Sequence, residues 1–218
     1  MRRLYATSDA ALPHPRMGRC DARSRHAKRM SWKRPPGITV ALLAPDGGGK
    51  TTLAKALERS LPAPVKRVYM GLFRQRGKIW ELPVAGLSLR LLLAWRSYLL
   101  GLFYRATGHI VIYDRYCFDA FLLPGPSPLY RIDRWLLGHS CPAPDLTLIL
   151  DVPGSVLHAR KQESAPALLE AKRQAYLQLS NIIPRARVVD GAVPFVDVHR
   201  HVAMLIEREY TRRRAHRS

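Results

Sequence analysis

The chain has 218 residues, 47% of them hydrophobic, and a formal net charge of +20 at neutral pH. This length and composition suit one globular domain with a buried core rather than a wholly disordered polar chain. The three scattered cysteines (Cys20, Cys117 and Cys141) exclude a paired disulfide framework and a cysteine-based metal site, and they fit a reducing cytoplasm.

The first 36 residues form a basic segment. Residues 1–35 hold ten Lys or Arg and two Asp, mix Pro with Gly, and show no apolar period, which predicts a disordered extension over 1–36. A nucleic-acid-binding arm, an organelle transit peptide and an overlong start before Met17 or Met30 are the alternatives. No secretory signal is expected, because an apolar stretch of the required length is missing. A folded domain is expected over 37–210, followed by a basic tail over 211–218.

Short apolar runs and helical patterns alternate along the folded region. Strands are expected over 38–43, 65–70, 110–113, 146–150 and a short run ending at 188–189. Helices are expected over 50–60, 84–104, 154–161, 168–181 and 195–210, with loops over 71–82 and 124–128. This alternation predicts an α/β fold with a parallel sheet and helices on both faces, which binds ligands at the carboxyl ends of its strands.

The expected helix over 84–104 is about as long as a bilayer is thick. Arg90 and Arg96 near its middle argue against a membrane span, because each charge is costly in lipid. Apolar residues such as Leu87, Leu91 and Tyr98 recur at helical spacing. We therefore expect a helix that packs on the sheet and could bury a further face in a homodimer.

A glycine-rich segment lies between the first expected strand and the first expected helix. It comprises Ala44, Pro45, Asp46, Gly47, Gly48, Gly49, Lys50, Thr51 and Thr52. The glycines allow backbone N–H groups to wrap around phosphate oxygens, and the helix N-terminus adds partial positive charge. Lys50 can reach the β- and γ-phosphates and the Thr51 hydroxyl can bind Mg²⁺, although Ala44 replaces the usual first glycine. The segment therefore predicts a site for ATP and Mg²⁺.

Acidic residues follow several expected strands. Asp46, Asp114, Asp151 and Asp190 all take this position, where a phosphate and metal site would need them. Aspartate also suits turns, and we interpret Asp151 and Asp190 in that way. Asp114 is followed directly by Arg115, and we interpret that pair as part of the site.

Five short motifs in the same order resemble the thymidylate kinase family. They are 46–52 in the phosphate loop, Asp114-Arg115-Tyr116 after the third strand, 144–152 at the fourth, 173–177 in the next helix and 189–191 at the fifth strand. The resemblance covers roughly residues 38–206. It implies a three-layer P-loop NTPase fold with a five-stranded parallel sheet, and phosphoryl transfer from Mg-ATP to a small phosphate acceptor such as a nucleoside monophosphate.

The resemblance also implies roles for individual residues. The residues implied in catalysis are Lys50, Asp114, Arg115 and Arg160. Those implied in acceptor binding are Asp46, Arg96, Arg115 and Tyr116, and those implied near the metal are Thr51 and Asp114. Arg160 and Lys161 stand where the family's lid supplies positive charge, and Gly47 stands where some members carry a basic residue. One well-placed arginine can raise the rate of phosphoryl transfer by several powers of ten.

The sequence also departs from that family. The family's Arg-Glu-Pro-Gly segment after the second strand is replaced by the different residues 69–76, and Asp119 stands where the family usually has Ser. The acceptor therefore stays open between a nucleoside monophosphate and a nucleoside, sugar or other alcohol, for which Asp114 would act as base. A non-catalytic, nucleotide-gated protein that docks on nucleic acid or an anionic membrane is a third hypothesis. No specific nucleic-acid or membrane partner is expected.

Overall fold

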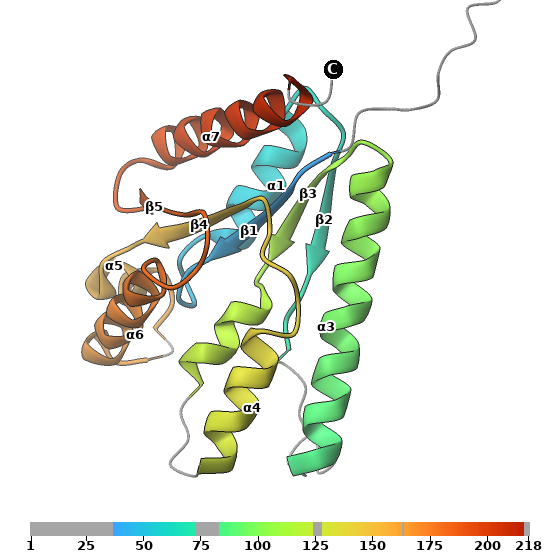
Figure 1. The fold of residues 1–218 in the computed structure, drawn as a ribbon. Helices are drawn as coiled ribbons and strands as arrows, with labels where there is room; N and C mark the ends of the chain where they lie inside the picture. The colour runs from blue at the N-terminus through green and yellow to red at the C-terminus, as the bar shows by residue number, and fades with distance from the viewer. Residues whose placement is uncertain (1–36, 73–82, 124–127, 163, 216–218) are drawn as a thin grey trace, which may run out of the picture. The chain divides into compact units, whose positions relative to one another are not determined.

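The parallel sheet expected from the sequence is present. The computed structural model describes residues 37–72, 83–123, 128–162 and 164–215, so the segment 1–36 lies outside the described residues. The strands are β1 (Thr39–Leu43), β2 (Val65–Tyr69), β3 (Ile110–Asp114), β4 (Leu146–Asp151) and β5 (Ala186–Asp190). They pair in parallel in the order β2-β3-β1-β4-β5 (Figure 1). Their carboxyl ends therefore lie along one edge of the sheet.

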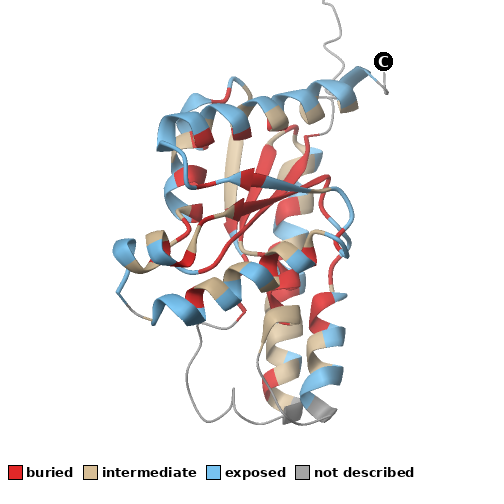
Figure 2. Cartoon of the chain, turned by 90° about the vertical axis from the view of Figure 1, so that its left-hand side faces the viewer, coloured by how far each residue is buried: buried red, intermediate tan, exposed pale blue. Residues whose placement is uncertain are grey.

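The three central strands are the most apolar. β1 and β3 are buried at every position and β4 is buried up to its final Asp151, whereas β2 and β5 at the edges are partly exposed (Figure 2). Continuous apolar runs are typical of parallel strands that are covered on both faces. The edge strands have water on one side, which explains their mixed sequences.

Helices cover both faces of the sheet, as predicted. α1 (Lys50–Ser60) and α7 (Phe195–Ala215) pack on one face, and α3 (Pro83–Ala106), η1 (Cys117–Leu122), α4 (Pro128–Gly138) and α6 (Pro166–Leu179) pack on the other. Alternate residues of β1 divide between the two cores, with Ala41 in one and Leu42 in the other. The short α5 (Gly154–Arg160) precedes α6.

Three elements differ from the sequence-based expectation. η1 and α4 are additional helices, and α4 begins at Pro128, which was expected to end a loop. α7 continues to Ala215, beyond the expected end at residue 210, so residues 211–215 extend the helix. Ion pairs stabilise this last turn, because Arg213 contacts Asp145 and Arg212 contacts Glu209.

The long apolar segment is the helix α3, as predicted. One face of α3, which includes the buried Ala94, packs in the core against the sheet. Among the described residues, none of the helices has the length and hydropathy needed to cross a bilayer.

Candidate functional site

A large cleft opens at the carboxyl ends of the strands. Its volume is about 1180 Å³. The glycine-rich loop, the end of β3, the end of α5 and the segment after β5 line it. Lining residues include Asp46, Lys50, Thr51, Asp114, Arg115, Arg160, Lys161, Val193 and Phe195. The fold therefore brings together most of the site residues that the sequence predicted.

The loop backbone takes the form that its glycines allow. Gly47 and Gly49 have φ angles of 86° and 81°, a left-handed conformation that disfavours a side chain. A Cβ added to Gly48 would lie 2.7 Å from the Ala44 Cβ. Ala44 itself is fully buried among apolar residues, so its methyl group faces the core instead of the cleft. Replacement of the first glycine of the motif therefore leaves the loop intact.

The N-terminus of α1 suits a phosphate group. The N-cap residue of α1 is Gly49. No side chain of the described residues forms a capping hydrogen bond with this end of the helix. No acidic residue lies in its first turn either. The first N–H groups of a helix lack intrahelical acceptors, and with the helix dipole they attract anions. The residues present thus fit the phosphates of a nucleotide.

Lys50 is folded back onto the loop. Its side chain is buried, and Nζ donates hydrogen bonds to the carbonyl oxygens of Ala44 (2.7 Å) and Pro45 (2.9 Å). Burial and the nearby Arg115 lower the pKa of Lys50 to about 8. Within the part of the chain that the structure describes, its hydrogen bonds go to neutral carbonyl oxygens, and a charged phosphate oxygen would bind this buried ammonium group more strongly.

Thr51 and Asp114 meet beside the loop. The Thr51 Oγ1 donates a hydrogen bond of 2.6 Å to the Asp114 Oδ2, which joins α1 to the end of β3. A hydroxyl and a carboxylate are hard oxygen ligands, which Mg²⁺ uses together with phosphate oxygens and water. These two residues therefore fit the metal site that was expected there.

Arg115 lies between two carboxylates. Its Nη2 pairs with Asp46 and its Nη1 with the Asp119 Oδ2 at 3.2 Å. Its φ angle of 73° is uncommon for a residue with a side chain. Although burial opposes these shifts, the mutual attraction raises the pKa of Arg115 and lowers that of Asp46. The guanidinium is therefore a permanent cation on the cleft wall.

Arg160 and Lys161 line the cleft from the end of α5. The phosphate loop lies against this helix, because a Cβ added to Gly47 would be 3.3 Å from the carbonyl oxygen of Leu157. Both cations are exposed to solvent. Their location agrees with the predicted contribution of lid charge, which stays a prediction.

Arg96 and Tyr116 lie away from this cleft. Arg96 lines a separate cavity of about 330 Å³, which shares Tyr69 and Gly71 with the cleft. Tyr116 is 1% exposed, and its hydroxyl donates a hydrogen bond to the carbonyl oxygen of Pro142 (2.6 Å). The chain turns into the core immediately after Arg115, and in this structure Tyr116 packs there. Its expected substrate contact stays a prediction that this burial does not favour.

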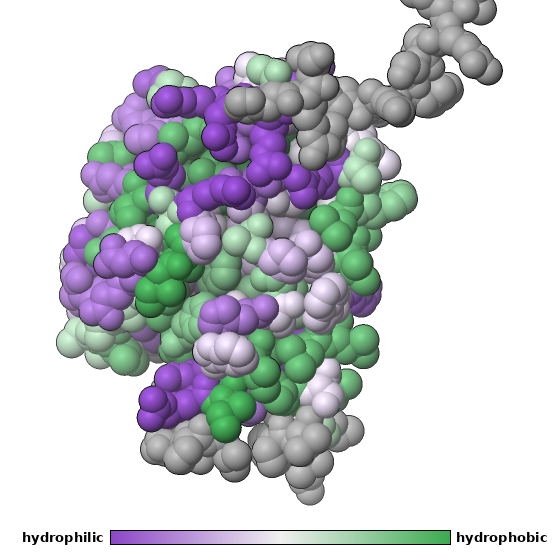
Figure 3. Space-filling view, in the orientation of Figure 1, coloured by the Kyte–Doolittle hydropathy of each residue, from purple (hydrophilic) through white to green (hydrophobic). Residues whose placement is uncertain are grey.

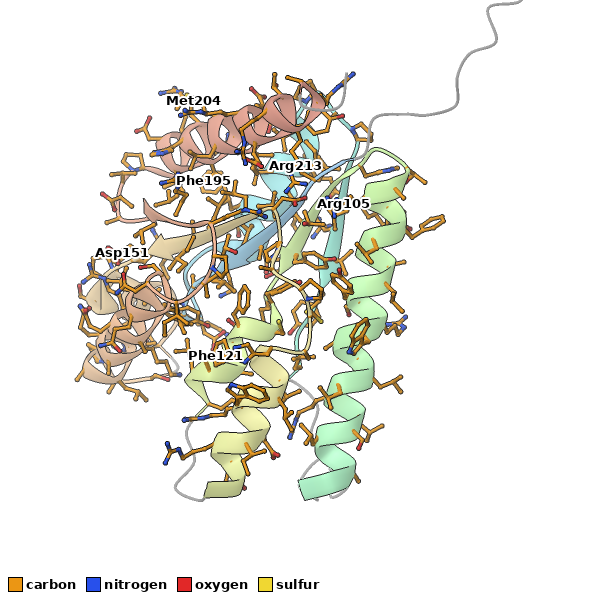
Figure 4. The ribbon with its side chains drawn as sticks, viewed as in Figure 1. Arg105, Phe121, Asp151, Phe195, Met204 and Arg213 are labelled. Carbon is orange, nitrogen blue, oxygen red and sulfur yellow. The ribbon has the colours of Figure 1, made fainter. Side chains whose placement is uncertain are left out.

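Sequence reasoning missed several lining residues, among them two after β2 and two after β5. Tyr69 and Gly71 follow β2, and Val193 and Phe195 follow β5. Phe195, which is labelled in Figure 4, begins α7. Its side chain is 47% exposed. These residues follow the carboxyl ends of predicted parallel strands, and that position could have identified them as cleft residues from the sequence.

The two remaining strand-end aspartates have structural contacts. Asp190 accepts a hydrogen bond from the backbone N–H of Ala192 (2.8 Å), as its interpretation as a turn residue requires. Asp151 pairs with Arg173 of α6. Neither aspartate is needed to explain the chemistry of the cleft.

Comparisons with known proteins find thymidylate kinases similar to this chain in sequence and in fold. No protein-family model matches the chain. A probable thymidylate kinase from Thermococcus onnurineus is 29% identical over 119 residues, which are 49% of this chain and 56% of that relative. The match thus spans about half the length of that curated relative. A solved thymidylate kinase from Candida albicans has a TM-score of 0.60, with 22% identity, over 82% of this chain and 94% of that chain.

Proposed function

From the chain's thymidylate kinase-like sequence and its P-loop NTPase fold, we propose that it is a kinase. It transfers the γ-phosphoryl group of Mg-ATP to a nucleoside monophosphate or a related small acceptor. The observation that carries this proposal is the contact between Thr51 and Asp114 beside the glycine loop, close to the buried Lys50. Phosphoryl transfer needs positioning and charge neutralisation more than covalent help, and these groups supply both.

The donor nucleotide occupies the glycine-rich side of the cleft. Its phosphates lie against the N-terminus of α1, and its nucleoside lies along Val193 and Phe195. Lys50 exchanges two carbonyl oxygens for phosphate oxygens, which it binds more strongly because they are charged. Mg²⁺ held by Thr51 and Asp114 would neutralise charge on the phosphates.

The acceptor enters on the side of Arg115. Arg115 orients the acceptor, and Arg160 with Lys161 balances the charge of the transferring group. The smaller cavity that contains Arg96 adjoins this side through Tyr69, and it offers room for the rest of the acceptor. The residues after β2 differ from those of thymidylate kinases, so thymidylate is one acceptor among those to be tested.

A kinase for a neutral alcohol is the second candidate. Asp46 and Asp119 already balance the charge of Arg115, which reduces its attraction for an acceptor phosphate. In that case Asp114 would receive the proton of the acceptor hydroxyl. The identity of the best acceptor separates the two candidates.

The test is an ADP-release assay across nucleoside monophosphates, nucleosides and sugars. We expect acceptor-dependent turnover that Lys50→Ala abolishes while circular dichroism and thermal unfolding show an intact fold. Lys55→Ala is the matched control, because Lys55 is an exposed lysine of the same helix. Retained turnover in Lys50→Ala, or no ADP release with every acceptor, would contradict the proposal.

The expected homodimer also belongs to the proposal. Leu92, Trp95, Leu99 and Phe103 are 65%, 45%, 54% and 63% exposed on α3. Figure 3 shows hydrophobic residues along this helix. Burial of this surface between two copies would stabilise a dimer.

Light scattering should show a dimer that Leu99→Glu converts to a monomer. Met204→Glu, on the exposed side of α7, is the control and should leave the dimer intact. A monomeric native protein would rule out the dimer.

A further inference from the structure

Asp119 is a buried carboxylate that the phosphate-loop chemistry leaves unexplained. It lies in η1, four residues after Arg115, and is 8% exposed. Its Oδ2 accepts a hydrogen bond from the Arg115 Nη1 (3.2 Å), and its Oδ1 accepts one from the Tyr176 hydroxyl (3.1 Å). Both carboxylate oxygens therefore have a partner, as a buried charge requires.

The two carboxylates that pair with Arg115 differ in their access to water. The Asp46 side chain is 51% exposed, whereas that of Asp119 is 8% exposed. Water can solvate Asp46 when it leaves the guanidinium, so that partner can be exchanged for an incoming acceptor. Water cannot replace Arg115 at Asp119, so the inner pair persists.

Tyr176 anchors Asp119 from a third element. Its side chain is 7% exposed and comes from α6, the helix that follows the segment after Arg160 and Lys161. Burial raises the pKa of Asp119, and Arg115 and Lys50 oppose that rise. The chain of contacts Arg115–Asp119–Tyr176 thus joins the end of β3 to α6.

We propose that Asp119 is a positioning residue: with Tyr176 behind it, its carboxylate holds the Arg115 guanidinium in the orientation that receives the acceptor. This inference rests on the proposed kinase function and assigns part of its acceptor specificity to a residue that need not touch the acceptor. Asp46 is the exchangeable partner of Arg115 and Asp119 is the permanent one.

Steady-state kinetics distinguish positioning from a merely structural role. Asp119→Asn removes the charge and keeps the shape, and we expect the KM for the acceptor to rise about 10- to 100-fold. The KM for ATP should stay unchanged. Tyr176→Phe should act in the same direction with a smaller effect, about threefold. A merely structural role would lower the folded fraction and leave both KM values unchanged, which would overturn the proposal.

Asp145→Asn is the matched control. Asp145 is an equally buried aspartate that pairs with two arginines at the opposite end of the sheet. This substitution should lower stability and leave both KM values unchanged. An acceptor effect equal to that of Asp119→Asn would show that any buried ion pair acts in this way, and would overturn the proposal.

A spectroscopic measurement tests, independently of turnover, whether Asp119 and Tyr176 fix the orientation of the Arg115 side chain. The side-chain NMR resonances of Arg115 can be assigned by their loss in Arg115→Lys. We expect Asp119→Asn and Tyr176→Phe to shift and broaden them, while the resonances of Arg173, which pairs with Asp151, stay unchanged as an internal reference.

If Asp119→Asn fails to fold, Tyr176→Phe carries the test. Unchanged Arg115 resonances would overturn the proposal. Lack of turnover in the native protein with every acceptor would instead overturn the kinase function.

Discussion

Both ends of the parallel sheet contain aspartates paired with arginines. At the amino end, the Asp145 Oδ2 accepts hydrogen bonds from the Thr39 N–H (3.0 Å) and hydroxyl (3.2 Å). Asp145 also pairs with Arg213 (2.5 Å) and Arg105 (3.5 Å), which come from the ends of α7 and α3 (Figure 4). At the carboxyl end, Asp119 pairs with Arg115 behind the cleft.

The two ends differ in what surrounds the charges. The contacts of Asp145 join β1 to two helix ends, and its oxygens are occupied by protein groups. At the carboxyl end, Lys50 binds loop carbonyls that it can exchange, and half of the Asp46 side chain faces solvent. The same residue types therefore stabilise the fold at one end and line an open cleft, the proposed ligand site, at the other. The open cleft and the uncapped N-terminus of α1 make the difference.

The largest expected effect is a loss of turnover from a substitution at the carboxyl end of the sheet. Asp114→Asn removes a carboxylate that fits Mg²⁺, and we expect turnover to fall about 100- to 1000-fold. The unfolding free energy should change little, because the asparagine can still accept the Thr51 hydrogen bond. Turnover measured across a magnesium titration checks this expectation. Turnover equal to that of the native protein would remove Asp114 from the metal site.

The next largest effect is a loss of stability from a substitution at the amino end of the sheet. Asp145→Ala leaves Arg105, Arg213 and the Thr39 N–H without their shared acceptor, and we expect the unfolding free energy to fall by about 3 kcal/mol. Urea unfolding measures this loss. Turnover per folded molecule should stay unchanged, since Asp145 is far from the cleft in the sheet. A selective change in either KM would show that the two ends are coupled.

A pH titration tests Lys50 itself. Its pKa of about 8 in the free protein lies below the ordinary value of 10.5, so the ammonium form is lost as the pH rises through about 8. We expect the affinity for ATP to weaken about tenfold between pH 7 and pH 9, because the neutral amine attracts phosphate less. Calorimetric titration checks this, and Lys50→Arg should give a flat profile over the same range. A flat profile in the native protein would contradict the shift.

The smallest effect concerns an aspartate outside both networks. Asp190→Ala removes the hydrogen bond to the Ala192 N–H in an exposed turn. We expect the unfolding free energy to fall by about 0.5 kcal/mol, with no change in turnover. Thermal unfolding and the ADP-release assay measure the two quantities. A loss of turnover would give Asp190 a role in the cleft that its turn contact does not explain.

Local patterns in the sequence were sufficient for much of the fold. The central strands were predictable because continuous apolar runs are needed where both faces of a strand are covered. α1 has the predicted bounds, since the glycines before Lys50 determine where it begins. η1 and α4 were missed, although Pro128 at the start of α4 is a favoured first helical residue.

The candidate site divides in the same way. The glycine-rich loop, Asp114 and Arg115 line the cleft, as the sequence alone predicted. A glycine-rich turn between a strand and a helix, and the residues that follow a strand, have local signatures. Tertiary structure decided which neighbouring side chains serve the cleft. It placed Tyr116 in the core and Asp119 beneath Arg115, where Tyr176 arrives from 57 residues further along the chain. Such contacts depend on how helices pack on the sheet, and no local pattern encodes them.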